Sequence, residues 1–181
     1  MKRFAISVLK FFFFFSAAGI FVVSLYPIVS PRIGYDLDQL RGRRYVLLNE
    51  EDVAMESAFG EMLRGAAPLK ILPVNKDFSI VIEKINVNAP IVANVSVSDE
   101  KEYKEALKMG VAHAKGSAPP GDGNTYLFAH SSLDFWQLGR YATIFNLLDK
   151  LEEGDRVFIF YQGERFEYRV SQSTVYKGFD A

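Results

Sequence analysis

The chain has 181 residues, of which 49% are hydrophobic and 24% charged, and its formal net charge is -1. This length fits one domain with appendages, and the balanced charge gives no electrostatic case for nucleic-acid binding. The absence of cysteine excludes a disulfide scaffold and thiolate metal ligands, and no carboxylate cluster has the spacing of a calcium site, so we expect neither a metal nor a cofactor.

The N-terminal segment is strongly apolar. From Phe11 to Val29 the chain runs for 19 residues without a charge, beginning with five consecutive phenylalanines. A helix of about 20 such residues crosses a bilayer, and Lys2, Arg3 and Lys10 all precede the run, which favours a cytoplasmic N-terminus. A cleaved signal peptide is the alternative, but no Ala-x-Ala site follows the run at a sensible distance. We therefore expect residues 1–29 to form a cytoplasmic tip and a single-pass anchor in the cell membrane, with the following domain outside the cytoplasm.

Residues 30–71 are expected to form a juxtamembrane linker and a helix. The linker contains prolines, glycines and four arginines, which fits a solvated segment better than contact with lipid phosphates. Asn49 is a candidate N-cap, because three acidic residues follow it and favour the positive end of the helix dipole. Gly65 is a candidate stop. The folded domain is then expected to occupy residues 72–181.

Two strands and a helix are predicted at the start of this domain. Apolar residues alternate with polar or smaller ones from Phe78 to Ile82 and recur across residues 85–92, which predicts two strands with a tight connection. Ser98 is the candidate N-cap of a helix over Asp99–Met109, which has acidic residues early and Gly110 at its end.

A short apolar strand, Tyr126–Ala129, is expected to end on His130. The loop before it is rich in proline and glycine: Gly116, Pro119, Pro120, Gly121 and Gly123. An imidazole at a strand terminus lies where loops build binding and catalytic sites on a rigid scaffold. His130 is therefore the candidate functional residue, although a histidine in such a place can also simply pack or form a hydrogen bond.

The remainder of the chain predicts further β-structure. Residues 135–151 indicate a loop and a short helix, and residues 157–161 and 166–170 indicate a hairpin that turns at Gln162 and Gly163. The predicted fold is mainly β, a small barrel with short peripheral helices behind one N-terminal transmembrane helix.

Three segments, in this order, resemble the sortase family of cysteine transpeptidases. Phe78–Val92 resembles the first hairpin of the family, Gly110–Ser132 the segment that delivers its catalytic histidine, and Phe145–Val170 the Leu-x-x-Gly-Asp strand and the hairpin after it. The resemblance implies a sortase-like β-barrel over residues 72–181. His130 matches the catalytic histidine of the family, and Ala129 stands where the family usually has glycine.

The resemblance also implies an activity and its partners. Sortases cleave a sorting motif such as Leu-Pro-x-Thr-Gly after the threonine: a cysteine thiolate forms a thioester, which an amine of the cell wall or of a pilin resolves. The histidine stabilises the thiolate or protonates the leaving amine. The implied partners are a sorting-signal peptide of secreted surface proteins, an amine acceptor and the lipid bilayer. No substrate-binding residue is assigned.

One departure from the family concerns the nucleophile. The Thr-Leu-x-Thr-Cys strand and the later active-site arginine have no counterpart in these 181 residues. The expectation is therefore a barrel that is incomplete at its C-terminus, truncated before cysteine and arginine, and inactive as given. The alternatives are a catalytically dead sortase-like domain that binds a surface peptide or has a structural role, and a membrane-tethered β domain unrelated to sortases.

The other polar residues near these segments receive no catalytic assignment. His113 is interpreted as a structural loop residue, with a role toward substrate as the minority view. Strand arginines are more often solvated, the serines lack a Gly-x-Ser-x-Gly elbow, and the aspartates fit turn or capping roles. These residues are Arg140, Arg156, Arg165, Arg169, Ser131, Ser132, Asp122 and Asp134.

Overall fold

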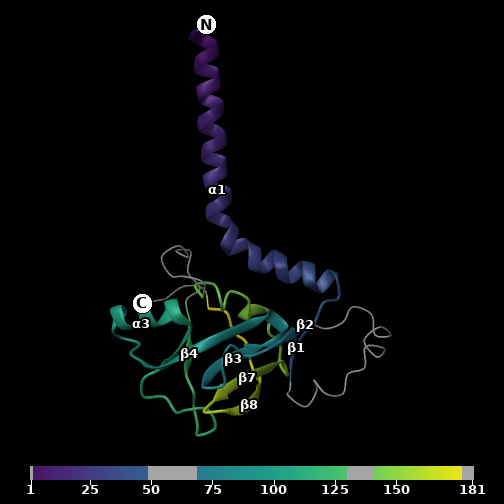
Figure 1. Cartoon of the computed structure of the whole chain (residues 1–181), viewed down its shortest axis with the longest axis vertical. Helices are drawn as coiled ribbons and strands as arrows, with labels where there is room; N and C mark the ends of the chain where they lie inside the picture. The colour runs from purple at the N-terminus through teal and green to yellow at the C-terminus, as the bar shows by residue number, and fades with distance from the viewer. Residues whose placement is uncertain (1, 49–68, 130–140, 177–181) are drawn as a thin grey trace.

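A computed structural model describes residues 2–48, 69–129 and 141–176 of the chain (Figure 1). The helices are α1 (Lys2–Leu40) and α3 (Glu100–Met109), with the 3-10 turns η2 (Glu83–Ile85) and η3 (Leu148–Lys150). The strands are β1 (Tyr45–Leu47), β2 (Leu69–Ile71), β3 (Phe78–Ile82), β4 (Val87–Val95), β5 (Val111–Ala114), β6 (Leu127–Phe128), β7 (Arg156–Tyr161) and β8 (Glu164–Arg169). The predicted helix after Asn49 lies outside the described residues.

Six strands form one mixed sheet in the order β6-β5-β4-β3-β7-β8. The pairs are antiparallel except β4 and β5, which are parallel and joined through α3. The prediction of a closed barrel is not met in the described part of the chain, where β6 and β8 are the two edges of an open sheet. The edges are bridged instead by the loop between β5 and β6, because the Gly121 amide donates to the Tyr168 hydroxyl of β8 at 3.1 Å.

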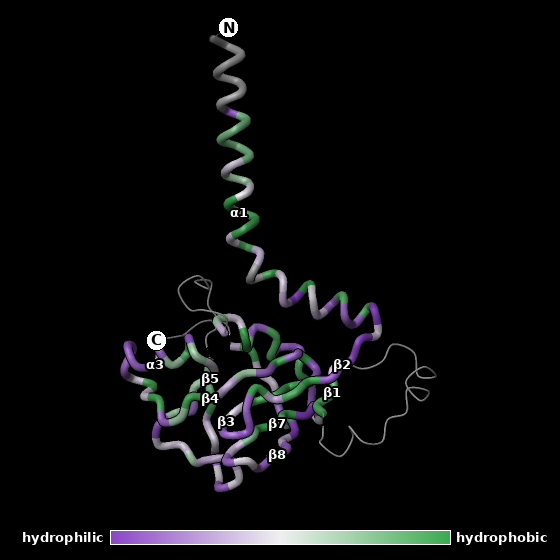
Figure 2. The backbone as a smooth tube through the Cα atoms, viewed as in Figure 1, coloured by the Kyte–Doolittle hydropathy of each residue, from purple (hydrophilic) through white to green (hydrophobic). Residues whose placement is uncertain are grey.

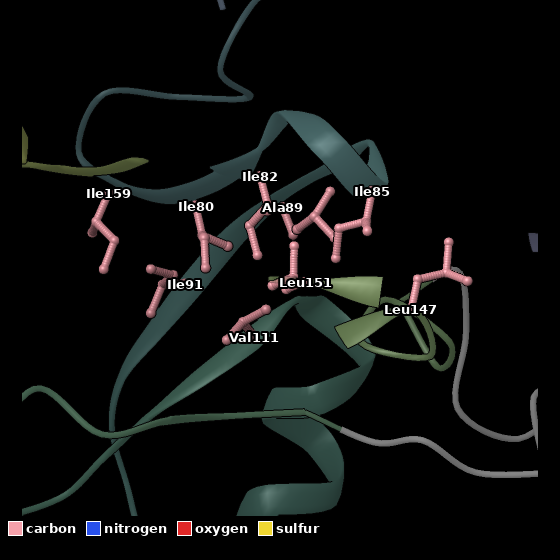
Figure 3. Close-up of a cluster of buried hydrophobic side chains, with 10 residues drawn as sticks. Ile80, Ile82, Ile85, Ala89, Ile91, Val111, Leu147, Leu151 and Ile159 are labelled. Atoms are coloured by element: carbon pink, nitrogen blue, oxygen red, sulfur yellow. The ribbon is translucent and has the colours of Figure 1, made fainter. Parts of the chain in front are cut away.

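The sheet is held by an apolar cluster on one face, which we call the inner core (Figure 3). Its buried members are Ile80, Ile82, Ile85, Val87, Ala89, Ile91, Val111, Leu147, Leu151 and Ile159. Side chains alternate between the faces of a strand, so the intervening residues of β3 and β7 point the other way. There Val81, Phe158 and Phe160 pack with Leu47 of β1 and Ile71 of β2, which we call the outer core. Strands β3 and β7 are therefore buried on both faces.

The crossover between β4 and β5 follows the predicted helix closely. The N-cap is Asp99 rather than the expected Ser98, since the Asp99 carboxylate accepts the amides of Lys101 and Glu102. Gly110 ends the helix as predicted. A side chain there is excluded by the neighbouring strand, because a Cβ at Gly110 would lie 2.2 Å from the Pro90 carbonyl oxygen.

Helix α1 continues beyond the predicted anchor, so residues 30–40, expected to be linker, are helical. The part from Lys10 to Tyr26, the first half, meets the part from Val29 to Leu40, the second half, at a bend of 64°. Pro27 and Pro31 lie at this bend, and proline lacks the amide hydrogen that would continue the helical ladder.

Taken singly, none of the helices in the described residues is both long and apolar enough to cross a membrane, whereas the two halves of α1 together meet the requirement in length and composition.

Candidate active site

The chain that leads to His130 is described up to Ala129, and His130 itself lies outside the described residues. Strand β6 pairs with β5 in antiparallel register, with Phe128 opposite Ala112 and Leu127 opposite His113. Ala129 packs against the inner core and also against the cluster of α3 and β5 around Leu107. The predicted strand Tyr126–Ala129 is therefore present in its central two residues, Leu127 and Phe128, and Ala129 follows it as a packed residue outside the strand.

The loop of residues 115–126 is attached to the body at several points. The Lys115 amide donates to the Val95 carbonyl of β4 at 2.8 Å, and within the loop the Ala118 amide donates to the Asn124 carbonyl at 3.1 Å. Gly121 has φ +92°, and a Cβ there would lie 2.7 Å from the Phe166 ring. The contact of Gly121 with Phe166 and Tyr168 places the proline- and glycine-rich loop against β8, at the far edge of the sheet from β6.

His113 holds the first turn of this loop from inside. Its side chain is buried, and Nε2 lies 3.1 Å from the Ala118 carbonyl and 2.9 Å from the Ser117 hydroxyl. The Ser117 hydroxyl donates to the Ala114 carbonyl at 2.9 Å, and a carbonyl can only accept, so Nε2 carries the proton that bonds the loop. The ring meets Phe78 edge-on with centroids 5.6 Å apart. These contacts support the structural interpretation of His113.

The strand arginines lie away from β6. Arg156 forms an ion pair with Glu83 at 2.7 Å, and Arg156 and Arg165 both stack over the Phe158 ring of the outer core. Arg169 donates to the Gly154 carbonyl at 3.2 Å. All three belong to β7 and β8, so the described structure does not bring them to the end of β6. Arg140, Ser131, Ser132 and Asp134 lie outside the described residues, and Asp122 occupies an exposed turn in the loop.

Two charged groups that sequence reasoning missed stabilise the other end of the sheet. The Glu83 carboxylate is buried, accepts the Leu47 amide at 2.6 Å and thereby ties β1 to η2. Lys84 Nζ donates to Glu152 and Asp155 at 2.7 and 2.8 Å. Burial alone would lower the pKa of Lys84, but the hydrogen bonds and charges of Asp155 and Glu152 raise it overall. No local pattern in the sequence predicts these contacts, because the residues that bind Glu83 and Lys84 are far from them in the chain.

The described surface includes the following two hollows. The larger, of about 1100 Å³, lies between the second half of α1, η2 and the start of β7. The smaller, of about 510 Å³, lies against the loop before β6 and is lined by residues that include Ser117, Asn124 and Tyr126. Within the described ranges, no group of three or more histidine, aspartate or glutamate side chains is placed to hold a metal ion.

Two of the comparisons with known proteins gave matches. The Sortase domain matches residues 80–179. Similar solved structures include a lid mutant of sortase C1 from Streptococcus agalactiae, with 30% identity, 55% of this chain and 48% of that chain covered, and a TM-score of 0.41. Sortase C-1 from Actinomyces oris has 26% identity, with 55% and 51% covered and a TM-score of 0.42. A search of curated proteins gave no match.

The chain thus spans about half the length of these solved sortases. The matched region runs from the second half of β3 through β8 and includes the loop, β6 and the position of His130. Because the family match covers more than half of the 181 residues, the chain belongs to the sortase family.

Proposed function

We propose that this chain is the histidine-bearing part of a sortase-type cysteine transpeptidase. The observation that carries the proposal is the family match over residues 80–179. Within this region, the loop of residues 115–126, which is bonded to Tyr168, and strand β6 directly precede His130 in the chain. The substrate is a peptide with a Leu-Pro-x-Thr-Gly-like sorting motif on a secreted surface protein. The acceptor is an amine of the cell wall or of a pilin.

The chemistry assigns His130 one proton-transfer step. A cysteine thiolate attacks the threonine carbonyl carbon, the Thr–Gly bond breaks, and His130 gives a proton to the departing glycine amine. The acceptor amine then attacks the thioester carbonyl carbon, gives a proton to His130, and releases the cysteine as the thiolate as the new amide bond forms.

The 181 residues contain no cysteine. The thiol sulfur is needed for the thioester, and the thiolate is its reactive form. We therefore propose that a protein made of these residues alone forms no acyl-enzyme and has no transpeptidase activity.

The proposal includes attachment to a membrane through the first half of α1. Phe11–Phe15 are 64–69% exposed in the structure, so nothing within the described residues covers these rings. Lys2, Arg3 and Lys10 precede the apolar run, which favours a cytoplasmic N-terminus and an extracytoplasmic sheet domain.

A second candidate is a sortase-like domain that binds a surface peptide without cutting it. The absence of cysteine from the 181 residues is the observation that favours it. The sheet needs no nucleophile for such a role, because neither its two cores nor the hydrogen bond from Gly121 to Tyr168 involves a cysteine.

The experiment begins with the intact mass of the natural protein and its reaction with a Leu-Pro-x-Thr-Gly peptide. A mass well above 20.4 kDa and a thioester adduct would support the transpeptidase. A mass of 20.4 kDa with peptide binding but no adduct would support the binding domain. Neither adduct nor binding would contradict both.

If the adduct forms, His130→Ala tests the assigned role. We expect kcat to fall by about 10³-fold or more, because members of a catalytic set act together. His113→Gln is the matched control, since it changes the other histidine and retains a donor near the position of Nε2. Equal losses of kcat in the two folded variants would contradict the assignment of His130.

A further inference from the structure

The second half of α1 has one face that docks on the sheet domain. Tyr35 packs against the inner core, and Asp38 accepts the Tyr45 hydroxyl at 2.8 Å. Arg32 forms an ion pair with Asp149 of η3 at 3.3 Å. These contacts attach the second half to the sheet domain at three positions, and the hollow of about 1100 Å³ lies between the same two parts.

The opposite face carries an apolar stripe whose four side chains are all exposed, two of them only in part. Val29, Ile33, Leu37 and Leu40 follow one another at intervals of four, four and three residues, which places them on one side of a helix. Their exposed fractions are 40%, 52%, 42% and 84%. One face of this helix is docked on the sheet domain and the other carries an exposed apolar stripe, so the helix has a second surface to which a partner can bind.

The bend in α1 gives this stripe a defined direction. Figure 1 shows the first half rising from one side of the second half while the sheet domain lies on the other side. The two halves meet at 64°. If the first half is tilted by about 26° from a bilayer normal, within the usual range for membrane helices, the second half lies flat in the plane of the membrane surface.

The second half also stays near that surface without such a tilt. Its 12 residues span about 18 Å, and with the first half along the normal they descend only about 8 Å. Arg41 follows the helix at the far end of the stripe, and its side chain has no polar partner among the described residues. Arg44 instead lines the hollow between the second half of α1 and the sheet domain.

We propose that Val29–Leu40 is an interfacial helix whose apolar stripe inserts into the headgroup and acyl boundary of the bilayer that the first half crosses. The inference rests on the proposed membrane attachment and goes beyond it by fixing how the sheet domain is oriented. Insertion is shallow, because the carboxylate of Asp36 lies beside the stripe and stays at headgroup level. The sheet domain, which contacts the opposite face of this helix, then lies directly next to the membrane surface.

The 181 residues contain no cysteine, so a cysteine introduced into a chain of these residues is its unique labelling site. The full chain carries a nitroxide at Ile33→Cys or Leu37→Cys on the stripe and is reconstituted in vesicles of phosphatidylglycerol and phosphatidylcholine. Phe21→Cys reports the first half, and Glu164→Cys on β8 is the control in water. Collision rates with oxygen and with a water-soluble nickel chelate measure the depth of each label.

We expect the Ile33 and Leu37 labels to collide with the nickel chelate about threefold less often than the Glu164 label, and more often than the Phe21 label. Stripe labels as accessible to nickel as Glu164, with Phe21 protected, would overturn the interfacial helix and leave the attachment standing. A Phe21 label accessible to nickel would overturn both. Dipolar broadening between stripe labels would show a second copy covering the stripe and would also overturn the proposal.

A second variant tests the stripe without labelling it. Ile33→Asn with Leu37→Asn changes two exposed side chains, so the sheet domain is expected to fold unchanged. With a nitroxide at Leu40→Cys, nickel accessibility should rise about threefold relative to the same label with the native stripe. No change in accessibility, with the Phe21 label still protected, would overturn the proposal.

Discussion

Helix α1 and the six-stranded sheet are both rich in phenylalanine and aliphatic residues, but only the sheet covers them with its own chain. Phe13 is 64% exposed, whereas Phe158 of β7 is 3% exposed. Figure 2 shows hydrophobic colour along the first half of α1, which stands clear of the body. The comparison teaches that an apolar sequence predicts burial but does not say whether the covering atoms belong to the same chain. Strands β3 and β7 are buried between two cores of this chain, whereas nothing within the described residues covers the phenylalanines of the first half of α1.

The largest expected effect is the difference between truncating Phe158 in the sheet and truncating Phe13 in α1. Phe158→Ala removes a ring from the outer core and should lower the free energy of unfolding of the sheet domain by about 3–5 kcal/mol. Phe13→Ala should leave that free energy unchanged, because its ring contacts nothing in the sheet. Urea unfolding followed by tryptophan fluorescence or circular dichroism measures both. Similar losses in the two variants would break the comparison.

A smaller effect is expected where the loop before β6 meets β8. Gly121→Ala forces a side chain into a positive φ and against the Phe166 ring, which should cost about 2–3 kcal/mol. Gly116→Ala is the matched control: its φ is +86°, but no atom lies within 4 Å of its Cβ, so it should cost about 1–2 kcal/mol from the backbone alone. Equal losses measured by thermal or urea unfolding would show that the contact with Phe166 contributes nothing.

The side chain of His113 should contribute less to the free energy of unfolding than Phe158 or Gly121. His113→Leu removes the donor to the Ala118 carbonyl, and the loss is partly offset because Nδ1 has no hydrogen-bond partner in the described structure. We expect a net cost of about 1 kcal/mol. His113→Gln should recover part of it, since its amide can donate near the position of Nε2. Leucine and glutamine variants of equal stability would argue against the hydrogen bond to the loop.

The smallest effect concerns the ion pairs of Lys84. Lys84→Met should cost less than about 1 kcal/mol at pH 7, because the partners are partly exposed. The folded-state pKa of Lys84 is raised, so the ammonium contributes its stability below the unfolded pKa of about 10.4 and loses it as pH rises through the folded pKa. The unfolding free energies of wild type and Lys84→Met should therefore converge above that pH. A gap that stays constant up to pH 11 would contradict this.

Much of the sheet could be predicted from the sequence, because alternation is a local signal. The segments around Phe78–Ile82, residues 157–161 and residues 166–170 correspond to β3, β7 and β8, and the helix ending at Gly110 is α3. The N-cap was misplaced by one residue, at Ser98 instead of Asp99, since both residue types cap helices and only geometry distinguishes them.

The features that escaped prediction depend on distant partners. Strand β1 is three residues long and gains its identity only from parallel pairing with β2, which lies more than 20 residues away. The prolines suggested a linker over residues 30–40, yet docking of Tyr35 and Asp38 accompanies a helix there. For the candidate site, the sequence predicted the strand before His130 and the identity of the loop, but not the attachment of Gly121 to Tyr168. The catalytic role of His130 stays a prediction.

The central place of β3 has a consequence for how the chain is made. β3 pairs with β4 a few residues away, but its other edge pairs with β7, where Ser79 stands opposite Phe160 about 80 residues later. During synthesis from the N-terminus, β3, β4, α3 and β5 emerge before β7. Until residues 156–161 join the sheet, the apolar strand Phe78–Ile82 presents an open edge that can pair with other chains. The interval between the arrival of β5 and that of β7 therefore sets how long this edge stays exposed.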